Sequence, residues 1–329
     1  MPTRRIWPWL ALAALGMLAA ADAPPNLIVN GDLEQPVAAG QLPAGWVTFS
    51  APGKDCKASV VTPGHNSGHC LLIEGNGEYC GVVCGKTPLA DDKSFVVAAW
   101  VKAEGGGNAH VKVDYTKPDG WLGSTEPFQA AADGQWHEMA IVDDRAAWAG
   151  ATDVGATAMI GGDGKAWFDD LALVAVPRVV GNLLANGGFE NGADGAATGW
   201  NIARPEDEKS ELIWTADAAH SGLHGLRLKG AKTYLVAVAA AVARDKAKTL
   251  TLSGWLRCRQ GEARVKFDFL KDEQWVGDQT SDPAPADGQW HQVSVTLDQT
   301  KFPDANNLAA AVLSTGPDGD ADADELVLK

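Results

Sequence analysis

Aromatic and charged side chains alternate with apolar ones in two segments of the C-terminal half of the chain. In “TLTLSGWLRC”, Trp255 and Arg257 lie on the strand face opposite a row of leucines. In “RVKFDF”, Lys266 and Asp268 alternate with Val and Phe in the same way. An outward aromatic ring can stack on the C–H face of a sugar while charged groups bond its hydroxyls. The pattern therefore predicts a face that binds carbohydrate.

An equivalent set of side chains occurs 154 or 155 residues earlier, in “AAWVK” and “VKVDY”. In both copies a further tryptophan follows in a Gly-flanked turn, “PDGWLG” and “DEQWVG”, where it would close one end of a groove. The earlier set is Trp100, Lys102, Lys112, Asp114 and Trp121, and the later set is completed by Trp275. The alternative is that Trp100 and Trp255 cover a core edge while Lys and Asp pair with each other.

These segments belong to a domain-sized repeat. “DGQWHE” at 133–138 returns as “DGQWHQ” at 287–292, and “NLIVNGDLE” at 26–34 returns as “NLLANGGFE” at 182–190. Every recurring landmark is offset by 154 to 156 residues, which predicts two copies of one fold. Each position in one copy therefore has an internal control in the other.

Short runs rich in Val, Thr, Leu and Trp, separated by Gly, Pro and Asp, predict many strands joined by turns. The fold class expected is all-β, with two tandem jelly-roll β-sandwich domains. The Ala-rich segment 234–248 resembles a helix, but its counterpart contains Gly and Pro, so we interpret both as a strand followed by a loop.

The N-terminal residues 1–23 combine two arginines, an apolar run and Ala21-Asp22-Ala23, which is typical of a secretory signal peptide cleaved near Ala23. We expect a secreted or periplasmic protein without a membrane span. The domains expected are a first sandwich at 24–176, a linker at 177–181 and a second sandwich at 182–329. The short linker leaves little slack between them.

The net charge of −15 and the lack of a basic run argue against nucleic acid as a partner. A nucleophile elbow, a phosphate loop and a Cys-x-x-Cys motif are all missing from the sequence. We therefore predict a protein that is not an enzyme. A small glycan-cleaving enzyme would need two facing carboxylates about 5 to 9.5 Å apart in a groove.

The order of “NGxxE”, “GW”, “HSG”, “GWxxR”, “DGQWH” and “xDDLxL” resembles the family 4 and 9 type of carbohydrate-binding module, a jelly-roll of the galactose-binding-like kind. The resemblance covers nearly all of both repeats. It implies a structural calcium in each, held by Glu34 with Asp169 and by Glu190 with Asp324. Calcium takes six to eight oxygen ligands, and backbone carbonyls of a Gly-rich opening could add to two carboxylates. The alternative is that these acids end strands in water.

Two further features leave alternatives open. “PDGDADADE” adds Asp318, Asp320 and Asp322, which we interpret as a solvated acidic turn because the spacing is not that of an EF-hand loop. Four of the five cysteines lie in the first repeat, and in an exported chain they could form two disulfides with three pairings, or be buried thiols. These four are Cys56, Cys70, Cys80 and Cys84, and the fifth is Cys258.

The sequence as a whole predicts an exported, non-catalytic protein that binds a poly- or oligosaccharide through two modules. Two modest sites on one chain would raise the avidity for a polymer. The main alternative is an extracellular structural or adhesion protein without a sugar ligand. An association with glycan-degrading enzymes is left open.

Overall fold

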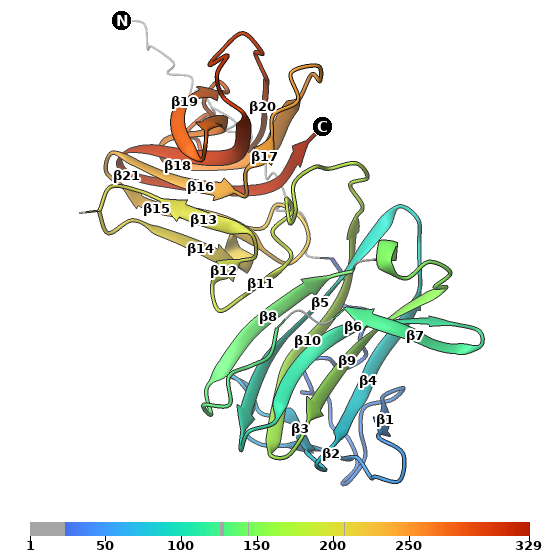
Figure 1. Ribbon diagram of the computed structural model, residues 1–329. Coiled ribbons are helices and arrows are strands. Elements are labelled where there is room, and N and C mark those ends of the chain that lie inside the picture. The colour runs from blue at the N-terminus through green and yellow to red at the C-terminus, as the bar shows by residue number, and fades with distance from the viewer. Residues whose placement is uncertain (1–23, 126–127, 144, 207) are drawn as a thin grey trace, which may run out of the picture.

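A computed structural model describes residues 24–125, 128–143, 145–206 and 208–329. The expected signal peptide lies outside these residues. The described chain is built almost wholly from antiparallel strands, arranged as two lobes (Figure 1), with two short 3-10 turns at Arg145–Ala147 and Ala216–Ala218. None of the described residues forms a helix long and apolar enough to cross a membrane.

The first domain is a sandwich of two antiparallel sheets. Sheet A has the order β1-β4-β9-β6-β7, and sheet B continues from β8 through β5, β10 and β3 to β2. The strands of sheet A are β1 (Val47–Ser50), β4 (Tyr79–Pro88), β9 (Asp153–Gly161), β6 (Asn108–Lys117) and β7 (Gly120–Thr125). Those of sheet B are β8 (Trp136–Val142), β5 (Lys93–Glu104), β10 (Lys165–Pro177), β3 (Cys70–Glu74) and β2 (Lys57–Val61).

This strand order is that of a jelly-roll. The eight strands from β3 to β10 are divided between two four-stranded sheets, β3-β10-β5-β8 and β4-β9-β6-β7, and the chain crosses between the sheets at every connection except the β6–β7 hairpin. Alternate residues of each strand point inward, so Val97, Ala99 and Val101 of β5 enter the core while Trp100 and Lys102 point out. The prediction of an all-β jelly-roll is confirmed.

The second domain repeats this strand order, but two pairs of strands that are separate in the first domain are each continuous here. The counterparts of β5 and β6 form one strand, and so do those of β9 and β10. Its strands β18 (Thr251–Lys271) and β21 (Asn307–Leu328) run continuously through both sheets. The other strands are β13 (Trp200–Ala203), β14 (Glu211–Thr215), β15 (Gly225–Ala231), β16 (Tyr234–Ala239), β17 (Val242–Ala243), β19 (Gln274–Thr280) and β20 (Trp290–Thr296). The Ala-rich segment is therefore strand and loop, as expected, and not helix.

The recurring opening motif contacts the closing strand in each domain. Asn182 donates to the carbonyl of Leu326 at 2.8 Å and accepts from the Leu328 amide at 2.9 Å. A Cβ on Gly187 would lie 2.2 Å from the Leu326 carbonyl oxygen, a contact that only glycine avoids. The motif therefore recurs because it closes the sandwich.

The two domains share an apolar interface. A short hairpin of the second domain, β11 (Gly192–Ala193) with β12 (Ala196–Ala197), pairs with β8 and extends sheet B of the first domain. Val96, Ala98 and Ala140, on the outer face of sheet B, belong to the same buried cluster as core residues of the second domain. The domains are thus packed together through a face that β-sandwiches usually leave in solvent.

Candidate functional site

A cleft of about 690 Å³ opens on the outer face of sheet A. Its lining comes from strands that are distant in sequence but adjacent in the sheet: β1, β4, β9, β6 and β7. The lining residues are Phe49, Tyr79, Val83, Lys86, Lys112, Asp114, Thr116, Trp121, Gly155 and Met159. Three aromatic rings around a small set of charged groups form an amphipathic surface, which suits a ligand with apolar faces and polar edges.

A buried carboxylate orients the most exposed ring of the cleft. Trp121 is 62% exposed, yet its indole Nε1 donates to Asp114 Oδ1 at 3.0 Å. Lys112 Nζ lies 3.3 Å from the same oxygen, and Thr157 donates its hydroxyl to Asp114 Oδ2. Asp114 is 7% exposed, so its charge is satisfied by these partners. The tryptophan is held in place by one edge while a ring face remains available.

The second domain has the same arrangement at equivalent positions. Trp275 is 61% exposed and donates its indole Nε1 to Asp268 Oδ1 at 2.9 Å. Lys266 Nζ lies 2.7 Å from that oxygen and 3.5 Å from Asp278 Oδ2. Recurrence of the whole triad of Trp, Asp and Lys shows that the arrangement is a property of the fold and not of one loop.

The surroundings of the triad differ between the two copies. Strand pairing makes Ala203 the equivalent of Phe49, and Tyr234, which is 39% exposed, the equivalent of Tyr79. Lys86 corresponds to Ala241 by position in the repeat. The second face therefore keeps two aromatic rings, whereas the first has three and an additional lysine.

Trp100 and Trp255 lie elsewhere, which corrects the expectation of one groove lined by all the candidate residues. Both are half-buried on the outer face of the opposite sheet, where Trp100 stacks on His65 with ring centroids 3.8 Å apart. Trp255 stacks on His220 at 4.2 Å. The cause is topological, because β5 and β6 follow each other in sequence but cross from one sheet to the other.

Lys102 and Arg257 are also outside the cleft. Lys102 Nζ lies 4.2 Å from the ring centre of Trp167, a cation–π contact on sheet B. Arg257 Nε donates to Asp322 Oδ2 at 2.7 Å, and its guanidinium lies 4.7 Å from the ring of Trp290. Both side chains are therefore engaged with protein groups on the face opposite the cleft.

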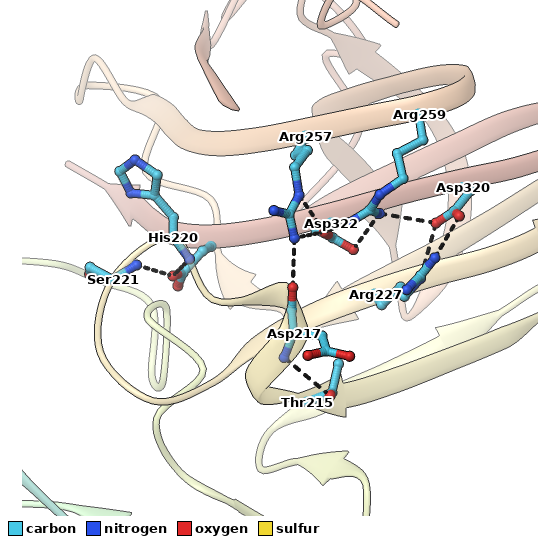
Figure 2. Close-up of polar contacts among 10 residues, drawn as sticks. Thr215, Asp217, His220, Ser221, Arg227, Arg257, Arg259, Asp320 and Asp322 are labelled. Atoms are coloured by element: carbon cyan, nitrogen blue, oxygen red, sulfur yellow. Dashed lines mark hydrogen bonds and ion pairs between the residues drawn. The ribbon is translucent and has the colours of Figure 1, made fainter. Parts of the chain in front are cut away.

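The acidic residues near the C-terminus form an ion-pair network and not a solvated turn. Figure 2 shows Arg227, Arg257 and Arg259 converging on Asp320 and Asp322. Arg227 pairs with Asp320 through two bonds of 3.1 and 2.6 Å, and Asp322 is fully buried. The expectation was wrong for Asp320 and Asp322, because β21 continues through this segment and places these alternate acids beside arginines of β15 and β18, whereas Asp318 is exposed as expected. Asp318, with a φ of 55°, precedes the network.

The carboxylates assigned to calcium lie next to each other at the sandwich closure. In the second domain Glu190 accepts from the Leu223 amide at 2.9 Å, and Asp324 accepts from the His220 and Ser221 amides at 2.7 and 3.0 Å. In the first, Glu34 accepts from the His69 amide at 2.8 Å and Asp169 from the Ser67 hydroxyl at 2.6 Å. The expected pairs are thus bonded to one loop in each domain.

Burial acts strongly on the second pair, and repulsion from neighbouring carboxylates adds to it. Burial raises the pKa of Asp324 to about 8, with a contribution from the charge of Glu325. Burial, followed by the charge of Asp324, raises the pKa of Glu190 well above its ordinary value. In the first domain burial also raises the pKa of Asp169. Two adjacent buried acids gain from a nearby cation, although no described residues gather three His, Cys, Asp or Glu side chains as a metal site.

Sequence patterns missed several residues of the cleft. Phe49, Tyr79, Lys86 and Met159 lie on three different strands, and alternation within one strand cannot show which sheet it joins. Tyr79 carried one usable signal, because it recurs as Tyr234 at the repeat offset.

Comparisons with known proteins give solved structures only. No family model matches the chain, and no curated protein matches it. The chain is similar to a tandem CBM22-1–CBM22-2 domain of Paenibacillus barcinonensis Xyn10C, with 13% identity, a TM-score of 0.36, and coverage of 94% of this chain and 99% of that one. A family 16 carbohydrate-binding module is 21% identical with a TM-score of 0.33, over 45% of this chain and 99% of that one.

A cyclase, Fisc from Fischerella sp. TAU, is also similar, at 14% identity and a TM-score of 0.36 over 48% of this chain and 98% of its own. At such TM-scores the likeness carries no argument about this chain. The fold assignment rests on the strand pairings themselves, and the particular family remains a prediction.

Proposed function

We propose that this protein binds carbohydrate without cleaving it, through the cleft on sheet A of the first domain and the equivalent face of the second. The observation that carries the proposal is the exposed tryptophan fixed by a buried aspartate, present in both domains beside a lysine. A preoriented ring loses little freedom on binding, which favours stacking on a sugar. Phe49 and Tyr79 extend this aromatic surface in the first domain.

The polar groups of the cleft supply hydrogen bonds at the edges of a stacked sugar. Lys112 can donate to a hydroxyl and Asp114 can accept from one, since each carboxylate oxygen has more than one lone pair. Among the described residues that line the cleft, Asp114 carries the one carboxylate, whereas glycoside hydrolysis commonly uses two. This supports binding without catalysis.

The test is titration of a panel of soluble polysaccharides against the full chain, its Trp121→Ala variant and a Trp100→Ala control. Loss of the Trp121 ring should weaken binding at the first-domain cleft about tenfold, equal to about 1.4 kcal/mol, and leave the face with Trp275 unchanged. Trp100→Ala should retain the affinity, because that ring lies on the other sheet. Binding to no member of the panel would favour the structural or adhesive alternative. An equal loss of affinity in both variants would mean that the cleft on sheet A is not the binding site.

We also propose a structural calcium at Glu190 with Asp324 and at Glu34 with Asp169. The donor chemistry fits, because paired carboxylates suit a hard divalent cation and neighbouring carbonyls can complete its shell; both acids are buried in the second domain, whereas in the first Asp169 is buried and Glu34 is exposed. A chelator should lower the melting temperature of ion-stripped protein relative to calcium-loaded protein. Glu190→Gln should remove the effect in the second domain and spare the first; identical melting curves with and without calcium would exclude the ion.

A further inference from the structure

Two cysteines of the first domain are brought together at one end of the cleft. Cys56 and Cys80 are separated by 24 positions in the chain, yet their thiols lie within hydrogen-bonding reach of each other. Cys56 Sγ also lies 3.4 Å from the carbonyl oxygen of Gly81, the residue after Cys80. Cys80 is fully buried, and Cys56 is half-buried against the same core.

The surrounding segments already hold this contact in register. Ser50, the last residue of β1, pairs with Cys80 of β4, and the Ala51 amide donates to the Tyr79 carbonyl at 3.0 Å. Asn76 Nδ2 donates to the Asp55 carbonyl at 3.1 Å, which ties the residue before Cys56 to the turn that leads into β4. The two thiols are thus positioned by bonds on both sides of the pair.

The second domain has no cysteines at the equivalent positions. Ser210 and Leu235 occupy the equivalent positions, as the pairing of β14 with β15 and the repeat offset show. There the loop is joined to the turn by Glu208, which accepts from the Lys232 and Thr233 amides at 3.1 and 2.8 Å. The second domain therefore joins this loop to the turn by hydrogen bonds to a carboxylate, at the place where the first domain has the two cysteines.

The other cysteines of the first domain have separate environments. Cys70 Sγ donates to the Pro63 carbonyl at 3.4 Å, and Cys84 Sγ lies 3.4 Å from the Val82 carbonyl. Cys84 corresponds to Ala239 of the second domain, which is typical of a thiol used as a small apolar residue. The contact between Cys56 and Cys80 therefore favours a single disulfide between these two residues, and Cys70 and Cys84 stay buried thiols.

We propose that Cys56 and Cys80 form a disulfide when the chain folds in an oxidising compartment, and that this bond fixes the Tyr79 end of the cleft to the loop after β1. The oxidant is a disulfide such as oxidised glutathione. One thiolate attacks its S–S bond and releases one glutathione thiol; the second cysteine displaces the other. Two protein S–H bonds are lost, one S–S bond forms, and the oxidant takes up two electrons and two protons.

The bond should form during folding rather than afterwards. Burial raises the pKa of the Cys56 thiol to about 12, with a contribution from neighbouring Cys80. Little of the reactive thiolate is then present in the native protein near neutral pH. The proposal depends on export of the chain but not on sugar binding.

The test refolds the reduced full chain in a glutathione redox buffer and maps the products under non-reducing conditions. Oxidation should lower the mass by about 2 Da, leave three of the five thiols titratable after denaturation, and join the peptide with Cys56 to that with Cys80. Reduction should lower the melting temperature of the first domain by about 5–10 °C, because a loop of this length is released.

Two variants make the result specific. Cys56→Ser, which copies Ser210, should keep all its remaining thiols and lose the sensitivity of melting to reductant. Cys84→Ala, which copies Ala239, should keep the crosslink. Five titratable thiols in the refolded wild-type chain, or a crosslinked peptide that joins other cysteines, would overturn the proposal even if both variants folded poorly.

Discussion

At the residue scale, Asp114 and Asp268 show how one buried charge can prepare an exposed ring. Each accepts from a tryptophan indole and lies beside a lysine, so one carboxylate fixes the orientation of the ring and is itself neutralised. A ring held in this way can stack without losing rotamer freedom. Glu190 and Asp324 present the opposite case, because both are buried and the charges that shift their pKa values are those of other carboxylates.

The burial of Asp324 predicts a pH dependence in calcium-free protein. The folded pKa of Asp324 is about 8, against an ordinary value of 3.8, so the folded state binds more protons than the unfolded chain between these values. The free energy of unfolding should therefore fall as pH rises from about 4 to about 8. Thermal melts in chelator across this range measure the trend, with Asp324→Asn as the control that should flatten it. A melting temperature in chelator that rises steadily over the same pH interval would contradict this prediction.

At the element scale, the closing strand depends on close backbone approach by the opening motif. Gly187 lies against the Leu326 carbonyl, and Gly31 lies in the same way against Leu171. The next position is unconstrained, because a Cβ on Gly188 would have no contact closer than 4.0 Å, and the first domain carries Asp32 there. The repeat thus distinguishes a required glycine from a tolerated one.

Gly187→Ala should destabilise the second domain by about 1–3 kcal/mol, because the added methyl group forces the closing strand away. Gly188→Ala should leave the stability within about 0.5 kcal/mol of the parent. Chemical denaturation of the two variants measures both values. Equal stability of Gly187→Ala and the parent would mean that the motif does not close the sandwich.

At the scale of the whole molecule, the outer face of sheet B differs between the two copies according to what covers it. Val96, Ala98 and Ala140 of the first domain contact the second domain. Their equivalents Thr251, Ser253 and Ser294 are polar, and Ser294 is exposed. His224 adds a bond of 3.1 Å to Glu138 across the interface. The apolar replacements in one copy are what makes the two domains pack as a pair.

Ala140→Asp should separate the domains, because it buries an unpaired charge in this interface. The radius of gyration in X-ray scattering should rise, and the two domains should melt as independent transitions. The matched control is Ser294→Asp, which places the same charge on the exposed face of the second domain. An unchanged scattering profile for Ala140→Asp would show that the interface does not hold the domains together.

The sequence alone determined the repeat, the strand-rich composition and the alternation within each strand, because these depend on local spacing. Lys112, Asp114 and Trp121 were found in this way, since all three lie on β6 and β7, a hairpin of contiguous residues. Tertiary structure decided which strands share a sheet. Trp100 precedes Lys112 by only 12 positions but lies on the opposite sheet, whereas Phe49 and Tyr79 come from distant segments to the same cleft. The burial of Asp322 among arginines was likewise a matter of strand register, which the sequence period of two leaves undetermined.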